Sequence, residues 1–229
     1  MKLKLPFINR ENYILITAYT KFTRVLENCP IVTSNMCVRD LPKPLEGETF
    51  NFSTCFGNTA GASRSITLPS YTEMFVDPDS QDIYKTPPDN YLNGWLLNMD
   101  NAYEMHKSLS MTKLIVPWML KCNKKGMLFV AAKHIYNRLP MMIPTGMLNF
   151  DITHGPNIFN AVAKGLSYKI PNNYPLLGMY PISDLPIRVE CVLDGTMFDY
   201  LAEEQHQRQY FRAGGIKHYA CIKKGVDNA

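Results

Sequence analysis

Short apolar runs separated by turn residues make up most of the chain, and this pattern is typical of β-strands. Residues 13–20 are rich in aromatic and β-branched side chains, which favour a pleated surface, and a second strand is expected within residues 22–33. Later strands are expected at residues 95–99, 113–122, 127–132, 141–150, 158–163, 167–170, 176–180 and 187–193. Short strands at intervals of roughly ten residues predict an antiparallel sandwich or barrel rather than alternating β–α units.

Helical patterns are few. Residues 196–211 follow an Asp-Gly turn, carry acidic side chains early and basic ones late, and end before Gly214 and Gly215. These features predict a C-terminal helix. Residues 67–75 are compatible with one or two helical turns, with Pro69 in the first turn. The predicted fold class is therefore mostly β, with antiparallel strands and one C-terminal helix.

The pattern divides the chain into three parts. Residues 1–94 hold the N-terminal strands, a long loop rich in proline and glycine, and the short helix. Residues 95–193 form the β domain, and residues 194–229 form the C-terminal helix and tail. A chain of 229 residues is also short enough for all three parts to belong to one domain.

The long loop, residues 39–65, has no strand or helix pattern. A long segment without regular structure in a compact domain is usually functional or covered by a partner. Phe50, Phe52 and Phe56 are the apolar groups that a neighbouring subunit would cover, so they are the predicted interface residues. The alternative is that the loop folds onto the sheet of its own chain.

Composition and charge narrow the range of functions. Hydrophobic residues make up 46% of the chain and charged residues 19%, as in globular proteins. The net charge of +4 is mild and the basic residues are scattered, whereas nucleic-acid-binding surfaces concentrate them on one face. Nucleic-acid binding is therefore weakly supported. No run approaches the roughly 18 apolar residues of a membrane-spanning helix, so no membrane partner is expected.

The sequence contains no complete catalytic or metal-binding motif. Its six cysteines follow no apolar secretory segment, so all six are expected to be free thiols in a reducing cytoplasm. Structural zinc sites usually bring cysteines or histidines in close pairs, and no such pair occurs. Nucleophile elbows and glycine-rich phosphate loops are also missing. We therefore predict no catalytic residue, no metal and no cofactor.

An ordered series of short motifs runs from residue 113 to residue 183. The motifs are Val116-Pro117-Trp118, Lys124-Lys125-Gly126, Pro144-Thr145-Gly146-Met147-Leu148-Asn149-Phe150-Asp151, Asn157-Ile158-Phe159, Ile170-Pro171-Asn172-Asn173-Tyr174-Pro175-Leu176 and Tyr180-Pro181. This order resembles a group of uncharacterised proteins of large tailed phages, marine ones in particular. The segment from Leu68 to Asp89 resembles the region that precedes the tryptophan in that group. The resemblance implies a phage protein.

The same motifs are distantly similar to the end of a dUTPase-like β-clip domain. Gly146 and Asp151 match that family's pattern, but Asn149 stands at the position of its water-activating aspartate. The glycine-rich C-terminal arm would correspond to Arg212, Gly214 and Gly215, without the serine or threonine that follows in the family. The resemblance implies a β-clip fold with Asn149, Asp151, Arg212, Gly214 and Gly215 as candidate nucleotide-binding groups. It also implies lost hydrolysis, because an amide cannot take a proton from water as a carboxylate does.

These observations predict a non-enzymatic phage protein that acts through its surfaces, as a structural or decoration component of the virion or as an assembly factor. Its expected partners are copies of itself, in a homo-oligomer such as a trimer, or other virion proteins. Its expected location is the host cytoplasm during infection, or the virion. Two alternatives stay open: a nucleotide-binding protein or diverged dUTPase-like pyrophosphatase, and a nucleic-acid-binding accessory factor.

Overall fold

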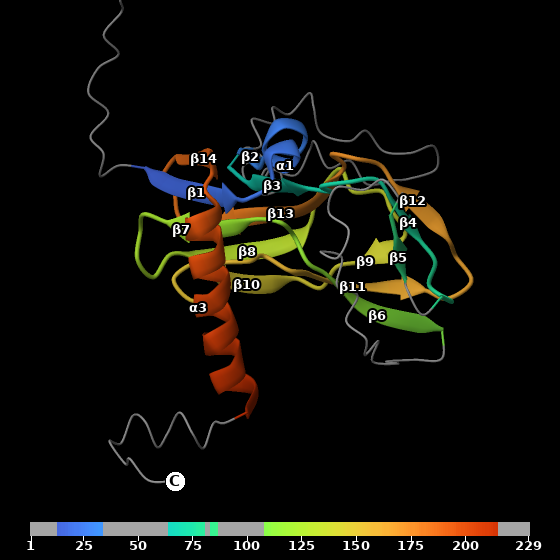
Figure 1. The fold of residues 1–229 in the computed structure, drawn as a ribbon. Helices are drawn as coiled ribbons and strands as arrows, with labels where there is room; N and C mark the ends of the chain where they lie inside the picture. The colour runs from blue at the N-terminus through green and yellow to red at the C-terminus, as the bar shows by residue number, and fades with distance from the viewer. Residues whose placement is uncertain (1–12, 34–63, 81–82, 87–107, 215–229) are drawn as a thin grey trace, which may run out of the picture.

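The fold consists mainly of β-strands, as a computed structural model of the chain shows (Figure 1). The structure describes residues 13–33, 64–80, 83–86 and 108–214. Within them the strands are β1 (Ile14–Thr20), β2 (Val32–Thr33), β3 (Ile66–Pro69), β4 (Met74–Val76), β5 (Tyr84–Lys85), β6 (Leu109–Leu114), β7 (Met119–Cys122), β8 (Leu128–Lys133), β9 (Met141–Met142), β10 (Gly146–Asn149), β11 (Ile158–Ala163), β12 (Tyr168–Ile170), β13 (Pro175–Pro181) and β14 (Ile187–Leu193), and the helices are α1 (Thr23–Asn28) and α3 (Gly195–Gly214). The predicted class, mostly β with one C-terminal helix, is confirmed, and the strands form open sheets as in a sandwich.

The largest sheet has five strands in the order β10-β8-β13-β3-β2, and all neighbouring strands are antiparallel. Residues paired in register lie on the same face of a sheet. One face, here called the inner face, carries the buried side chains of Phe129 and Met179. Leu148 pairs with Phe129 and Gly146 pairs with Ala131, so these two β10 residues also belong to the inner face. The opposite face is called the outer face.

A second sheet, in the order β14-β1-β7, shares its core with the inner face. Strand β1 alternates strictly, with Ile14, Ile16 and Ala18 fully buried in that core. Strand β1 pairs antiparallel with β7 but parallel with β14. The parallel pair departs from the antiparallel expectation because it joins segments from opposite ends of the chain, whose pairing the local pattern does not encode.

Helix α3 packs on the other side of β1 and β7. Phe198 and Leu201 are buried against Met119 and Tyr19. The helix begins where the Asp194 carboxylate accepts a hydrogen bond from the backbone N–H of Met197 at 2.9 Å, as expected for an N-cap. Figure 1 shows that the rest of α3 projects beyond the sheets. The predicted helix at residues 196–211 is confirmed, with slightly wider bounds.

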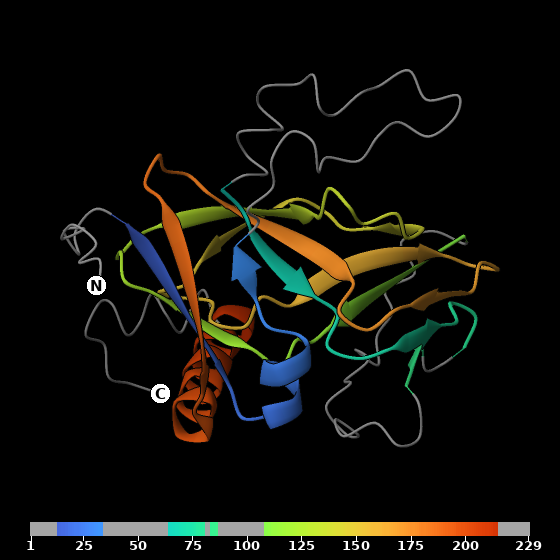
Figure 2. The ribbon, with the colours of Figure 1, turned by 90° about the horizontal axis from the view of Figure 1, so that it is seen from above.

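Two small sheets, β6-β11-β9 and β12-β4-β5, form the end of the molecule away from α3 (Figure 2). Between them the Tyr84 hydroxyl donates a 2.7 Å hydrogen bond to the Asn160 side-chain oxygen. Strands from residues 1–94 belong to the same sheets as strands from residues 95–193: β1 pairs with β7, and β3 pairs with β13.

Several predicted elements were wrong in kind or in extent. The strand expected within residues 22–33 is instead α1 followed by β2. The run Thr-Arg-Val-Leu-Glu-Asn lacks the alternation of a strand, because its apolar residues Val25 and Leu26 are adjacent, with Val25 buried and Leu26 partly buried against the core. Residues 67–75 form β3 and β4 rather than a helix, because their backbones pair with β13 and β12, and this arrangement buries Leu68 and Met74.

Two long predicted strands are divided in the structure. Residues 113–122 split into the end of β6 and β7, and residues 141–150 split into β9 and β10. Each break contains a proline, Pro117 or Pro144, which cannot donate to a sheet ladder. The strand expected at residues 95–99, almost all of the 39–65 loop with its three phenylalanines, and Gly215 lie outside the described residues.

Candidate functional site

The turn after β10 contains two of the predicted nucleotide-binding residues, Asn149 and Asp151. The Asn149 side-chain oxygen accepts the backbone N–H of Asp151 at 2.9 Å. The Asp151 carboxylate in turn accepts the backbone N–H of Gly126, in the turn between β7 and β8. Both side chains therefore have structural roles: Asn149 closes its own turn, and Asp151 holds two turns together.

The other predicted nucleotide-binding residues belong to the end of α3. The backbone of Arg212 and Gly214 forms the last turn of that helix, at the end that projects away from the sheets (Figure 1). The structure therefore brings Asn149 and Asp151 together but places the described arm residues at a separate end of the molecule.

A buried polar anchor fixes the loop after this turn to α3. The His154 ring nitrogens lie 3.2 Å from the Leu120 carbonyl oxygen and 3.2 Å from the Glu204 carboxylate. The next residue, Gly155, donates its backbone N–H to the side-chain oxygen of Gln205. Sequence reasoning did not find this anchor, because its two halves are 50 residues apart in the chain. The anchor holds the loop that forms one wall of a pocket.

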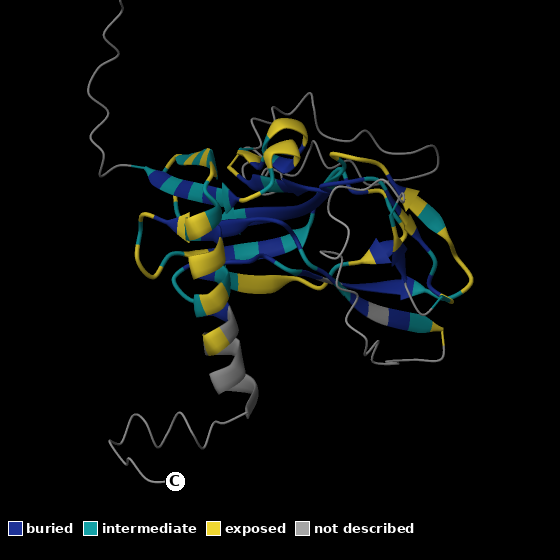
Figure 3. Cartoon of the chain, viewed as in Figure 1, coloured by how far each residue is buried: buried dark blue, intermediate teal, exposed yellow. Residues whose placement is uncertain are grey.

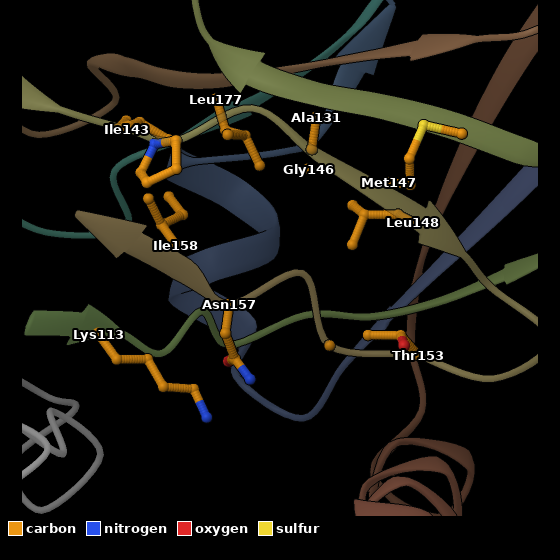
Figure 4. Close-up of a pocket in the computed structure, with 12 residues that line it drawn as sticks. Lys113, Ala131, Ile143, Gly146, Met147, Leu148, Thr153, Asn157, Ile158 and Leu177 are labelled. Carbon is orange, nitrogen blue, oxygen red and sulfur yellow. The ribbon is translucent and has the colours of Figure 1, made fainter.

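The pocket has a volume of about 370 Å³ and lies beside the β10 end of the inner face. Figure 4 shows Ile143, Leu148, Ile158 and Leu177 arranged around its apolar part. Gly146, Met147 and Leu148 are consecutive lining residues, so β10 itself forms one wall. Sequence reasoning missed this pocket too, since its walls come from separate strands.

Polar groups lie on the opposite side of the pocket from the apolar side chains. They are Lys113 of β6, with Thr153 and Asn157 of the anchored loop (Figure 4). Lys113 is the ionisable group among the lining residues, and burial lowers the pKa of its amine. A pocket with these walls can bind an apolar group. The described residues of the lining include no carboxylate or histidine that would serve as a general base beside the lysine.

The outer face of the five-stranded sheet is a second feature that could serve binding. Its paired side chains are those of Val32, Thr67, Gly178, Tyr180, Val130, Ala132, Leu128, Met147 and Asn149. None of these residues is charged. Three apolar side chains at the β8–β10 end are strongly exposed: Leu128 at 41%, Met147 at 55%, and Ile182, just beyond β13, at 57%.

The described cysteines, Cys29, Cys122 and Cys191, are free thiols, and burial raises the pKa of each. In the part of the chain that the structure describes, no three His, Cys, Asp or Glu side chains are placed to hold a metal ion. Neither described helix combines the length and the apolar character needed to cross a membrane.

No protein-family model matches the chain, and no curated protein matches it significantly in sequence. The resemblances to tailed-phage proteins and to the β-clip therefore stay predictions.

Proposed function

We propose that the chain is a non-enzymatic protein of a tailed phage that binds copies of itself and serves as a virion component or an assembly factor. The observation that carries this proposal is the outer face, which is uncharged across five strands and exposes Leu128, Met147 and Ile182 at one end. Soluble monomers rarely leave a contiguous apolar patch of this kind in water, and such patches usually mark interaction sites.

The composition of the face favours a protein partner over a nucleic acid. A nucleic-acid surface needs lysines or arginines to contact phosphates, and the paired positions of the outer face contain none. Its mixture of aliphatic side chains, methionine and a half-buried tyrosine matches the composition of protein interfaces. The turn that holds Asn149 and Asp151 also favours a non-enzymatic role, because both side chains already have backbone partners.

The test is the oligomeric state of the full chain with and without a charge on this face. We expect the purified protein to be an oligomer by light scattering at micromolar concentration, and Leu128→Glu and Ile182→Glu to shift it toward monomer. A buried unpaired carboxylate in the contact is strongly unfavourable. Leu166→Glu is the matched control, because Leu166 is 45% exposed but lies in the turn between β11 and β12.

A monomeric wild-type protein, or equal dissociation by the face variants and the control, would contradict self-association. The virion assignment has its own measurement: the protein should co-sediment with purified phage particles. If the protein is recovered only in the particle-free fraction, it is not a virion component, and the proposal is reduced to an assembly factor.

A further inference from the structure

Strand β10 is an edge strand of the five-stranded sheet in the part of the chain that the structure describes. It pairs with β8 on one side and with no other strand among the described residues. Proteins usually protect such edges with charged side chains, with prolines or with covering segments. The sequence from Met141 to Phe150 has no charged residue, and its proline lies just before β10 rather than within it. Figure 3 shows β10 in the exposed and intermediate colours, whereas β8 beside it also has buried positions.

Gly146 opens the pocket toward this edge. It lies on the inner face opposite Ala131, and a Cβ added to it would meet no atom within 4 Å. Its backbone does not have the positive φ that would require glycine. The consequence of having glycine here is therefore the space that it leaves. In a strand added beside β10, the side chain opposite Gly146 would have its Cβ roughly 5 Å away and would point into this space.

The pocket selects the kind of side chain that can enter. Its volume of about 370 Å³ and its walls of Ile143, Ile158 and Leu177 suit an aromatic ring. The pocket and the edge together fit an extended, uncharged peptide segment with aromatic side chains at alternate positions, which is recognition by strand addition.

The chain contains one segment with this chemistry: residues 49–53, Thr-Phe-Asn-Phe-Ser. Phe50 and Phe52 are two residues apart, so in an extended strand their side chains share one face. We infer that the edge of β10 and its pocket bind residues 49–53 of a second copy of this chain. This inference rests on the proposed self-association and identifies the segment and the site that carry it.

A second copy is inferred as the donor because the β10 edge adjoins the exposed side chains of Leu128, Met147 and Ile182, which form the proposed contact between copies. The segment itself belongs to the connection between β2 and β3, at the opposite end of the five-stranded sheet from β10. The connection is long enough to span that separation of about 15 to 20 Å within one copy, so binding within one copy is the outcome that the experiment has to exclude. Between two copies, each would donate one segment and receive one, which gives a closed two-fold arrangement with two equivalent contacts.

The experiment uses the full chain with Phe50→Asn and Phe52→Asn, which removes the proposed donor rings and leaves the pocket intact. This variant should be monomeric with an unchanged far-ultraviolet circular dichroism spectrum. A fluorescent peptide of residues 47–54 should bind to it by anisotropy, and the same peptide with asparagine at both phenylalanine positions should not. Adding Gly146→Leu fills the pocket and should weaken peptide binding by at least about tenfold.

Thr145→Leu is the control for the filled pocket, because it introduces the same side chain one residue earlier, at an exposed position outside the lining. It should change the peptide's affinity by less than about twofold. Failure of the peptide to bind the double phenylalanine variant, or equal effects of the two leucine substitutions, would overturn the inference.

Failure of the inference can be told apart from failure of the proposed function. One outcome is that the double phenylalanine variant stays oligomeric while Leu128→Glu converts the protein to a monomer. Self-association then holds, and the strand-addition site is wrong. If the wild type is a monomer that excludes the peptide while the double variant binds it, the segment fills the pocket of its own copy. That result would overturn both the second-copy assignment and the proposed self-association.

Discussion

Burial determines the protonation state of His134. Its Nδ1 atom accepts the backbone N–H of Tyr136 at 3.2 Å, so the proton lies on Nε2, which is 3.1 Å from the Thr67 hydroxyl and donates to it. The ring is almost fully buried without a carboxylate partner among these contacts. Burial lowers the pKa of His134 from 6.5 to about 4, and the neutral ring is the native form.

This burial predicts a loss of stability in mild acid. The unfolded chain binds the proton at the ordinary pKa of 6.5, whereas the folded chain resists it until about pH 4. The stabilising contribution is therefore complete above pH 6.5 and falls as the pH is lowered to about 4, by roughly 3 kcal/mol in total. Urea unfolding across this range measures it. In His134→Gln the free energy of unfolding should lose this part of its dependence on pH. An unchanged pH dependence in that variant would exclude His134 as its source.

Asn149 provides a second prediction for a single residue. Because its side chain already accepts the Asp151 N–H, we expect the protein to release no pyrophosphate from dUTP above background. Asn149→Ala should instead lower the free energy of unfolding by about 1 kcal/mol, the usual contribution of one hydrogen bond. A pyrophosphate assay beside urea unfolding separates the two roles. Turnover in the wild type that Asn149→Ala abolishes would restore the pyrophosphatase alternative.

Among the elements, those with strong local patterns were predicted well. Strands β11 and β14 have the expected bounds, and α3 differs from its prediction by a few residues. Elements whose form depends on distant partners were not. Residues 67–75 form strands because β13 and β12 pair with them, and β14 lies parallel to β1 because the two ends of the chain meet. The pocket has the same origin, since Lys113 and Leu177 meet only in the folded protein.

The attachment of α3 gives a prediction at the scale of an element. Gln205 is buried and accepts the N–H of Gly155, so Gln205→Ala would leave a buried donor unpaired. This change should destabilise the protein by about 1 to 3 kcal/mol. Gln207→Ala is the control, because Gln207 is exposed and its side chain donates to Glu203 within the helix. It should cost less than about 0.5 kcal/mol. Equal unfolding free energies for the two variants would show that the hydrogen bond between Gln205 and Gly155 does not stabilise the fold.

At the scale of the whole molecule, α3 and the proposed contacts lie on different sheets. Helix α3 packs on the side of β1 and β7 that faces away from the five-stranded sheet. The outer face and the β10 edge both belong to the five-stranded sheet. A partner could therefore contact the face and the edge together, and the two sets of variants should act on one assembly rather than on separate ones.

The uncharged surface predicts how self-association depends on salt. Contacts that depend on ion pairs or on phosphate groups weaken as salt rises, because mobile ions screen the charges. The outer face and the β10 edge have no charges to screen, so the dissociation constant should stay constant between low and moderate sodium chloride. Ammonium sulfate should tighten it, because sulfate strengthens apolar burial. Sedimentation velocity over a dilution series at each salt concentration measures the constant. A steep weakening with sodium chloride would indicate that charged residues elsewhere form the contact, and it would contradict an apolar interface.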